Sequence, residues 1–238
     1  MRLEVDRVVA GYGKVEVLHG ISLAVGQGER VGLFGPNGHG KTTLLRTISS
    51  LIRPRSGSVT FDGARLSALS PRHIVERGLI HVPQGNTLFP RMTVLENLML
   101  GAYSPRAWPR RQESLARVFT LFPKLAQRQQ QLCRTLSGGE RQMVSIGIGL
   151  MGLPTLLMLD EPTLGLAPKI KDELAAAISD IAASGVTMLV VDQDIELLLS
   201  VCQRLYFIEN GQVSLETQEG MQFDQQQILE MYFGTARR

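Results

Sequence analysis

The sequence predicts an α/β protein in which helices cover both faces of a parallel sheet. Short, continuously apolar strands, "RVGLFG" (30–35), "TLLMLD" (155–160) and "VTMLVVD" (186–192), alternate with helical patterns. Strands that are buried on both faces lack the polar alternation of half-exposed strands, and strand–helix alternation favours parallel pairing. The length of 238 residues also allows a full hydrophobic core.

The N-terminal third is expected to be rich in strands. The first thirty residues form short strands that are punctuated by turns at 11–13 and 26–28. After the strand at 30–35, "KTTLLRTISSLI" has a helical pattern. Further strands are expected in "RSGSVTFDG" and in "GLIHVPQ", where Pro83 ends the strand.

The middle of the chain, from about 89 to 150, has a helical pattern. Leu115, Val118, Phe119 and Phe122 recur at the spacing of one helix face. Later segments predict a helix near 169–183, a hairpin in "RLYFIENGQVSLE" and a short C-terminal helix in "QQQILEMYFG".

Charge, cysteine content and hydropathy argue against nucleic-acid binding, metal binding by cysteines, export and membrane spanning. The 25 basic and 22 acidic side chains leave a net charge of +3, which is too small to indicate nucleic-acid binding. Cys133 and Cys202 lack metal-ligand spacing and favour a reducing compartment. The first residues have no apolar signal core, so we expect no export. The longest uncharged run, 143–159, is shorter than the ~20 residues that a membrane-spanning helix needs.

A phosphate-binding loop is the first motif with chemical meaning. "GPNGHGKT" (35–42) follows a strand and opens a helix, and backbone N–H groups of such a loop wrap phosphates while its lysine adds a positive charge. A strand–turn–helix with a chance lysine is the alternative, which the context disfavours. The predicted nucleotide-binding residues here are Gly35, Pro36, Asn37, Gly38, His39, Gly40, Lys41, Thr42 and Thr43.

Two adjacent acids end the apolar strand "LLMLDEP". Strand tips of a parallel sheet open onto a ligand crevice, so Asp160 is predicted to hold Mg²⁺ together with the Thr42 hydroxyl. Glu161 is predicted to be the general base for a water molecule. Two acids at a strand end also suit a solvated turn; the phosphate loop favours the catalytic interpretation.

A glycine-rich helix start, "LSGGERQ", provides a second set of free N–H groups. It lies 21 residues before Asp160, counted from Gly139. Together with the phosphate loop and "LLMLDEP", this segment resembles the signature of the ATP-binding-cassette family, and the likeness extends over the whole chain. In that family the signature acts on the ATP of a second cassette. The resemblance assigns ATP contacts to Ser137, Gly138, Gly139 and Glu140.

The resemblance implies a fold and a domain organisation. The fold is a phosphate-loop NTPase core of the RecA-like type with a parallel sheet, an N-terminal antiparallel β subdomain and a helical signature subdomain. The chain is expected to be one cassette domain, 1–238. Its core and β subdomain would occupy approximately 1–84 and 153–238, and its helical subdomain 85–152.

The same resemblance assigns three smaller roles. Tyr12 matches the aromatic residue that stacks on adenine, although it also suits a plain surface tyrosine. Gln84 matches the glutamine that reaches Mg²⁺ and the attacking water. The family's permease docks on the helical subdomain, where the candidate contacts Leu88, Phe89 and Met92 equally suit an ordinary core.

Two positions depart from the family pattern. Gln193 occupies the place of a histidine that contacts the γ-phosphate and the base, and no histidine lies downstream of His81. A glutamine amide can donate a hydrogen bond to the phosphate but cannot relay a proton. Asp192 and Asp194 are expected to point elsewhere because side chains alternate along a strand. Ala167 stands where an aspartate is common in the family.

Within the family, "EPTLGLAP", "SGGERQM" and "VPQGNTLFPRMTVLENL" are most similar to cassettes of bacterial branched-chain, or hydrophobic, amino-acid importers. Urea-type importers share much of this pattern and remain an alternative. Ile148 and Gly149 replace an arginine and an alanine that are usual in close relatives, and the sequence shows no compensation for this change.

The resemblance thus implies an ATPase that requires ATP and Mg²⁺ and powers solute uptake. Its expected partners are a second cassette of a related but different chain, arranged head to tail, two permeases and an extracytoplasmic binding protein. It would lie peripherally on the cytoplasmic face of a bacterial inner membrane.

Two other classes of function are possible alternatives. A non-transport ATPase on nucleic acid is disfavoured because only some 95 residues separate Lys41 from Leu136, with no zinc cysteines, coiled coil or basic stripe. An ATP-sensing module with little hydrolysis is favoured by Gln193 and Ala167 and opposed by Glu161.

Overall fold

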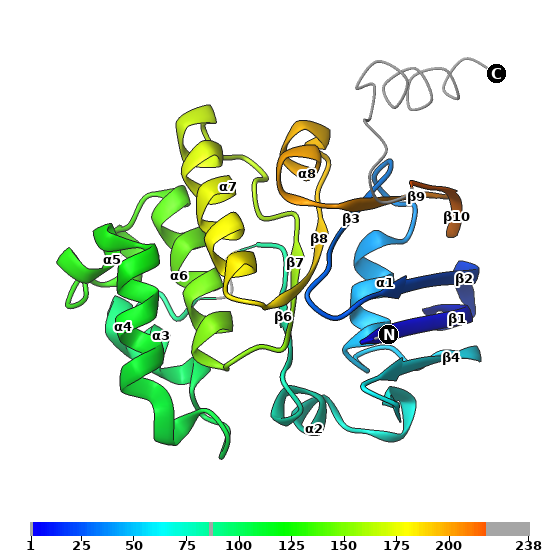
Figure 1. The fold of residues 1–238 in the computed structure, drawn as a ribbon, viewed down its shortest axis with the longest axis horizontal. Helices are drawn as coiled ribbons and strands as arrows, with labels where there is room; N and C mark the ends of the chain where they lie inside the picture. The colour runs from blue at the N-terminus through cyan, green and yellow to red at the C-terminus, as the bar shows by residue number, and fades with distance from the viewer. Residues whose placement is uncertain (1, 86–87, 218–238) are drawn as a thin grey trace.

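A computed structural model describes residues 2–85 and 88–217, and within them the chain forms two sheets and a group of helices (Figure 1). The larger sheet has six strands in the order β10-β9-β3-β8-β7-β6. Its strands are β3 (Arg30–Phe34), β6 (Leu79–Val82), β7 (Leu156–Asp160), β8 (Thr187–Val191), β9 (Arg204–Glu209) and β10 (Gln212–Glu216). Five of them are parallel, and β10 returns antiparallel to β9 as a hairpin. The predicted parallel sheet is confirmed.

The smaller sheet is antiparallel, in the order β2-β1-β4-β5. It contains β1 (Leu3–Tyr12), β2 (Val15–Val25), β4 (Ser56–Phe61) and β5 (Ala64–Arg65). The sequence predicts short strands here, whereas β1 and β2 are 10 and 11 residues long. The register of β1 against β2 shifts between Val5 and Val8. Such bulges interrupt the regular alternation of apolar residues, which is why the strands look shorter in the sequence.

The helices fall into two groups along the chain. Those of the β-rich part are α1 (Lys41–Ile48), α2 (Pro71–Glu76), α7 (Pro168–Ala183) and α8 (Ile195–Val201). Between β6 and β7 the chain inserts α3 (Val94–Gly101), α4 (Arg111–Leu121), α5 (Pro123–Gln127) and α6 (Gly138–Met151). The helix predicted near 169–183 is confirmed, while the short α2 and α8 were not predicted. The expected helix in "QQQILEMYFG" lies outside the described residues.

Two apolar clusters lie on opposite faces of the large sheet. Along β7, Leu157 and Leu159 belong to the cluster beneath α6, α7 and α8, whereas Leu156 and Met158 belong to the cluster beneath α1 and the antiparallel sheet. Figure 1 shows these two layers on either side of the sheet. Successive side chains of a strand therefore point into the two cores in turn, which explains why the strands are apolar throughout.

No helix within residues 2–85 and 88–217 is long and apolar enough to cross a membrane.

Candidate functional site

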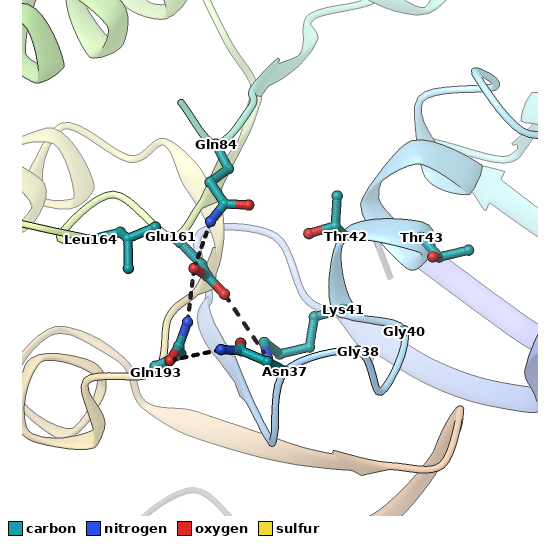
Figure 2. A pocket seen from close by; sticks show the side chains of 10 residues that line it. All are labelled: Asn37, Gly38, Gly40, Lys41, Thr42, Thr43, Gln84, Glu161, Leu164 and Gln193. Carbon is teal, nitrogen blue, oxygen red and sulfur yellow. Dashed lines mark hydrogen bonds and ion pairs between the residues drawn. The ribbon is translucent and has the colours of Figure 1, made fainter. Parts of the chain in front are cut away.

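A polar cavity of about 390 Å³ opens at the carboxyl ends of the parallel strands. Figure 2 shows residues from four segments around it: the turn between β3 and α1 together with the start of α1, Gln84 shortly after β6, the segment that follows β7, and the segment that follows β8. The residues that line it are Asn37, Gly38, Gly40, Lys41, Thr42, Thr43, Gln84, Glu161, Leu164 and Gln193. This is the edge at which open α/β sheets bind ligands.

The turn between β3 and α1 depends on glycine. Gly35 has φ 149°, and a Cβ built there would lie 2.1 Å from the carbonyl oxygen of Ile208 on β9. Gly40 ends the turn with φ 103°, a conformation that favours glycine, and α1 begins at Lys41. The turn therefore presents the N-terminus of α1 to the cavity, and this geometry suits an anion.

Lys41 is a buried cation at the base of the cavity, with only 5% of its surface exposed. Its Nζ donates to the carbonyl oxygens of Gly35, at 2.7 Å, and Pro36, at 3.0 Å. Burial lowers the pKa of Lys41, and the nearby charge of Glu161 opposes that shift. A cation so placed and so poorly hydrated would interact strongly with phosphate oxygens.

Glu161 lies at the centre of the site, with a backbone φ of 48° that is uncommon for a residue other than glycine. Its N–H donates to the carbonyl of Val191 at 2.7 Å, which fixes the backbone against β8. Gln84 and Gln193 each donate an amide hydrogen to Oε2, at 2.8 and 2.9 Å, and Lys41 Nζ lies 4.0 Å from Oε1 (Figure 2).

Gln193 is also held by a residue of the phosphate loop, Asn37. Its Oε1 accepts a long hydrogen bond, 3.4 Å, from the side-chain amide of Asn37. The two flanking acids are engaged elsewhere. Asp192 accepts from the backbone and hydroxyl of Thr163, and Asp194 caps α8 and pairs with Lys171 at 2.6 Å. Of the three polar residues that follow β8, only Gln193 thus lines the cavity.

Asp160 is 2% exposed and lies behind Glu161, at the end of β7. The Thr42 hydroxyl donates to its Oδ1 at 3.3 Å, while Oδ2 is buried without a hydrogen-bond partner. Burial raises the pKa of Asp160 to about 6. An unpaired buried carboxylate oxygen beside a hydroxyl fits a hard cation such as Mg²⁺, which takes oxygen ligands and brings the compensating charge.

Two groups of predicted residues lie outside this cavity. Ser137 and Glu140 form a capping box at the start of α6: Glu140 Oε2 accepts from the Ser137 N–H at 2.8 Å, and Ser137 Oγ accepts from the Glu140 N–H at 3.3 Å. Gly138 is exposed. Tyr12 ends β1 with 46% of its surface exposed, and its hydroxyl accepts from Arg46 of α1 at 3.0 Å. Neither group meets the cavity within one chain.

The structure also reveals features that the sequence did not indicate. Leu164, 57% exposed, lines the cavity from the loop after Glu161. His39 makes no contribution to the cavity lining; its Nδ1 accepts the backbone N–H of Asn210, at 3.0 Å, from the β9–β10 turn. No local sequence pattern marks Leu164 as a lining residue, because its position depends on the turn that the backbone makes at Glu161, where φ is 48°.

The unusual pair Ile148 and Gly149 lies on α6. A Cβ on Gly149 would approach Val82 Cγ2 to 2.7 Å, so glycine here allows α6 to pack closely on β6. Both residues line an apolar cavity of about 290 Å³. Among the candidate docking residues, Leu88 is buried in the core with 8% exposure, whereas Phe89 is 57% exposed.

A parallel sheet with a glycine-rich phosphate loop, a lysine, and two consecutive acids at the carboxyl end of β7 defines a phosphate-loop nucleoside triphosphatase. The chain belongs to the ABC transporter family, whose model matches residues 18–164, and it is an ATPase of that family.

Similar proteins cover almost the entire chain. It is 38% identical to the high-affinity branched-chain amino acid transport ATP-binding protein BraG of Pseudomonas aeruginosa, over 98% of this chain and 99% of that protein. It is 36% identical to the glutamine transport ATP-binding protein GlnQ of Escherichia coli, over 89% of each chain. A crystal structure of an ATP-binding cassette in its ADP conformation has a TM-score of 0.84 and 26% identity, and covers 98% of both chains.

Proposed function

We propose that this chain is the ATP-hydrolysing subunit of a membrane importer and that the carboxylate of Glu161 is its general base. The observation that carries the proposal is the fixed position of Glu161, between two amide donors and Lys41, in a cavity that opens beside the phosphate loop. Phosphoryl transfer needs mainly positioning and charge stabilisation, and these residues could provide both.

The phosphates of ATP would lie over the N-terminus of α1, close to Lys41. Thr42, Asp160 and Gln84 would hold Mg²⁺, which when bound neutralises charge on the phosphate oxygens. The nine predicted residues from Gly35 to Thr43 would form the phosphate cradle, in which His39 holds the loop and does not touch the phosphates. Tyr12, exposed beside α1, would stack on the adenine.

The two donors leave Oε1 of Glu161 as the oxygen that can take a proton from water. Attack by this water on the γ-phosphorus would form a new P–O bond and break the bond to the ADP oxygen. The carboxylate would accept the proton of the water, and Gln193 would orient the carboxylate without taking a proton itself.

A second cassette would complete the site. Ser137, Gly138, Gly139 and Glu140 lie outside the cavity of their own chain, and a head-to-tail partner would bring the equivalent segment over the ATP. A solved dimeric structure of a bacterial ABC transporter cassette, with a TM-score of 0.79 and 25% identity, supports dimerisation of this fold. We propose that the partner is a related but different chain.

We further propose that the importer takes up branched-chain or hydrophobic amino acids. The whole-length similarity to BraG supports this cargo, and urea or another small solute is the alternative. The helical part, 85–152, would dock on a permease served by an extracytoplasmic binding protein. The core and the β subdomain would occupy 1–84 and 153–238. Docking would hold the chain on the cytoplasmic face of a bacterial inner membrane.

Uptake of radiolabelled leucine and urea tests the cargo in cells that express the complete transporter. Replacing the wild-type chain with Glu161→Gln should abolish leucine uptake and leave urea uptake unchanged. A loss of urea uptake alone would identify the alternative cargo. Unchanged uptake of both, despite an inactive ATPase in vitro, would refute the role in import of either solute.

A further inference from the structure

A second cavity lies at the opposite edge of the large sheet. It has a volume of about 240 Å³ and is lined partly by the residues that precede β7 (153–155) and β8 (184–186). The nucleotide cavity opens at the carboxyl ends of these same strands, so the two cavities are separated by the length of the sheet. This cavity plays no part in the chemistry assigned to Glu161.

Arginine dominates the lining of the second cavity. Arg2, Arg106, Arg110 and Arg117 all contribute, and none of the lining residues that the structure describes is acidic. Two carboxylates lie just outside: Asp62 pairs with Arg2 at 2.9 Å, and Glu113 pairs with Arg110 at 2.7 Å. Four guanidinium groups against two carboxylates leave a local excess of positive charge.

Several donors in this cavity have no partner. Ser114 lies in the first turn of α4 and is 4% exposed. Its hydroxyl has no hydrogen-bond partner among the described residues. Arg2 Nε is likewise buried and unpartnered. Arg106 makes no hydrogen bond or ion pair to the described residues, although it lies against Gly78. The buried donors of Ser114 and Arg2 are costly without an acceptor, which an anion would supply. The guanidinium of Arg106 is exposed and is not used by another residue that the structure describes.

We propose that this cavity binds a small phosphate-bearing anion. The guanidinium fork matches phosphate oxygens in pairs, and the Ser114 hydroxyl adds a neutral donor at the wall. The volume is below the ~300–1,000 Å³ of pockets for drug-sized ligands, which favours a phosphate or pyrophosphate group. The source of the group is either a free soluble anion or the headgroup of an acidic phospholipid.

The chain contains its own reporter for this test. Its single tryptophan, Trp108, lies between Arg106 and Arg110 in the sequence and does not line the nucleotide cavity. Inorganic pyrophosphate should therefore change Trp108 fluorescence in a saturable manner. The change should persist when ATP saturates the phosphate loop, and it should weaken as salt screens the arginines.

Variants separate specific binding from general charge attraction. Arg106→Gln removes an exposed cation that has no polar partner in the described structure, so the fold and the basal ATPase rate should be unchanged. It should weaken pyrophosphate binding about tenfold, as expected for one charged hydrogen bond. Ser114→Ala should weaken binding less. Arg53→Gln, which removes an exposed arginine outside both cavities, should have no effect.

Vesicles distinguish the two sources of phosphate. Cosedimentation that requires phosphatidic acid in phosphatidylcholine vesicles, and is lost in Arg106→Gln, would identify a lipid headgroup. Binding of pyrophosphate without such cosedimentation would identify a soluble anion. The proposal is overturned if neither probe binds, if ATP displaces the pyrophosphate signal, or if Arg53→Gln weakens binding as much as Arg106→Gln does.

Discussion

The amide Nε2 of Gln193 lies 2.9 Å from Oε2 of Glu161 and donates a hydrogen bond to it. Gln84 donates to the same oxygen from the opposite side, at 2.8 Å (Figure 2). Both donors are neutral amides that keep their hydrogens at any ordinary pH. The orientation of the Glu161 carboxylate is therefore set by groups that do not titrate, and Oε1 is left to face Lys41 and the cavity.

Gln193→Ala is expected to lower kcat for ATP hydrolysis by about 10- to 100-fold, with a small change in KM. The substitution removes one of the two amides that orient the base, and small errors in position cost rates of this order. Steady-state hydrolysis at saturating ATP measures the effect.

Gln193→His provides the matched control because an imidazole can also donate to Glu161. We expect it to recover most of the rate and to introduce an inflection near pH 6–7, close to the ordinary pKa of histidine. The wild-type rate should lack this inflection if Gln193 holds the base. An equal loss in the alanine and histidine variants would show that Gln193 has another role.

Glu161→Gln should reduce ATP turnover on the order of 10² or more, because the substitution removes the proton acceptor while preserving the shape of the side chain. ATP should still bind, since Lys41 and the phosphate loop are unchanged. Equilibrium binding of labelled ATP and release of phosphate measure the two effects separately. Unaltered turnover would exclude Glu161 as the base, and turnover that is equally slow in both proteins would favour a module that senses ATP.

Gel filtration of the same variant tests the assembly. With Mg²⁺-ATP, a shift to twice the monomer mass would show that two identical chains close on the nucleotide. We expect no shift, with ATP still bound, because the proposed partner is a different chain. A shift would therefore contradict that part of the proposal.

The sequence was most informative where one local pattern determines one local structure. The phosphate loop, the acids that end β7 and the helix start at Ser137 are each contiguous, so the motif and its backbone can be predicted together. The parallel sheet could be predicted because its strands are apolar throughout, and their alternate residues pack into two different cores.

The contacts between distant segments could not be predicted in this way. The hydrogen bond from Asn210 to His39 joins residues that are 171 positions apart in the sequence, and no local pattern encodes it. The hydrogen bond from Gln193 to Glu161 also depends on how β7 and β8 end relative to each other. The bulges in β1 could not be predicted because they arise in its pairing with β2. The helix α2 has a local start signal in Ser70 and Pro71, but its six residues are too few to show a helical period.

Asp160→Asn is expected to stabilise the nucleotide-free protein and to abolish Mg²⁺-dependent hydrolysis. Burial raises the pKa of Asp160 from 3.8 in the unfolded chain to about 6. The folded protein therefore binds more protons between these values, and its stability falls as pH rises from about 4 to about 6. Above pH 6 the penalty is complete, and a rise of this size corresponds to about 3 kcal/mol at most.

Urea unfolding at several pH values measures this penalty. At pH 7.5 the asparagine variant should be more stable than the wild type by roughly 1–3 kcal/mol, and the difference should shrink toward zero near pH 4. Greater stability of the wild type at neutral pH, without Mg²⁺ or nucleotide, would contradict a buried and unpaired carboxylate.

His39→Ala is expected to weaken ATP binding a few-fold and to leave kcat nearly unchanged. The ring nitrogen accepts the Asn210 N–H at 3.0 Å, while the His39 carbonyl accepts the Gly211 N–H at 3.1 Å. The alanine variant removes only the first of these bonds, worth about 1 kcal/mol, and so loosens the phosphate loop where it meets the β9–β10 turn. Binding of a fluorescent ATP analogue measures the change in affinity.

His39→Asn separates a positioning role from direct contact with the nucleotide. The Oδ1 atom of asparagine occupies nearly the same place as Nδ1 of histidine and can accept the same N–H, but asparagine lacks the rest of the ring. If His39 acts by holding the loop to the turn, His39→Asn should restore most of the affinity that His39→Ala loses. If both variants bind ATP equally weakly, the imidazole must itself contact the nucleotide, and the phosphate loop must then move away from Asn210 when ATP binds.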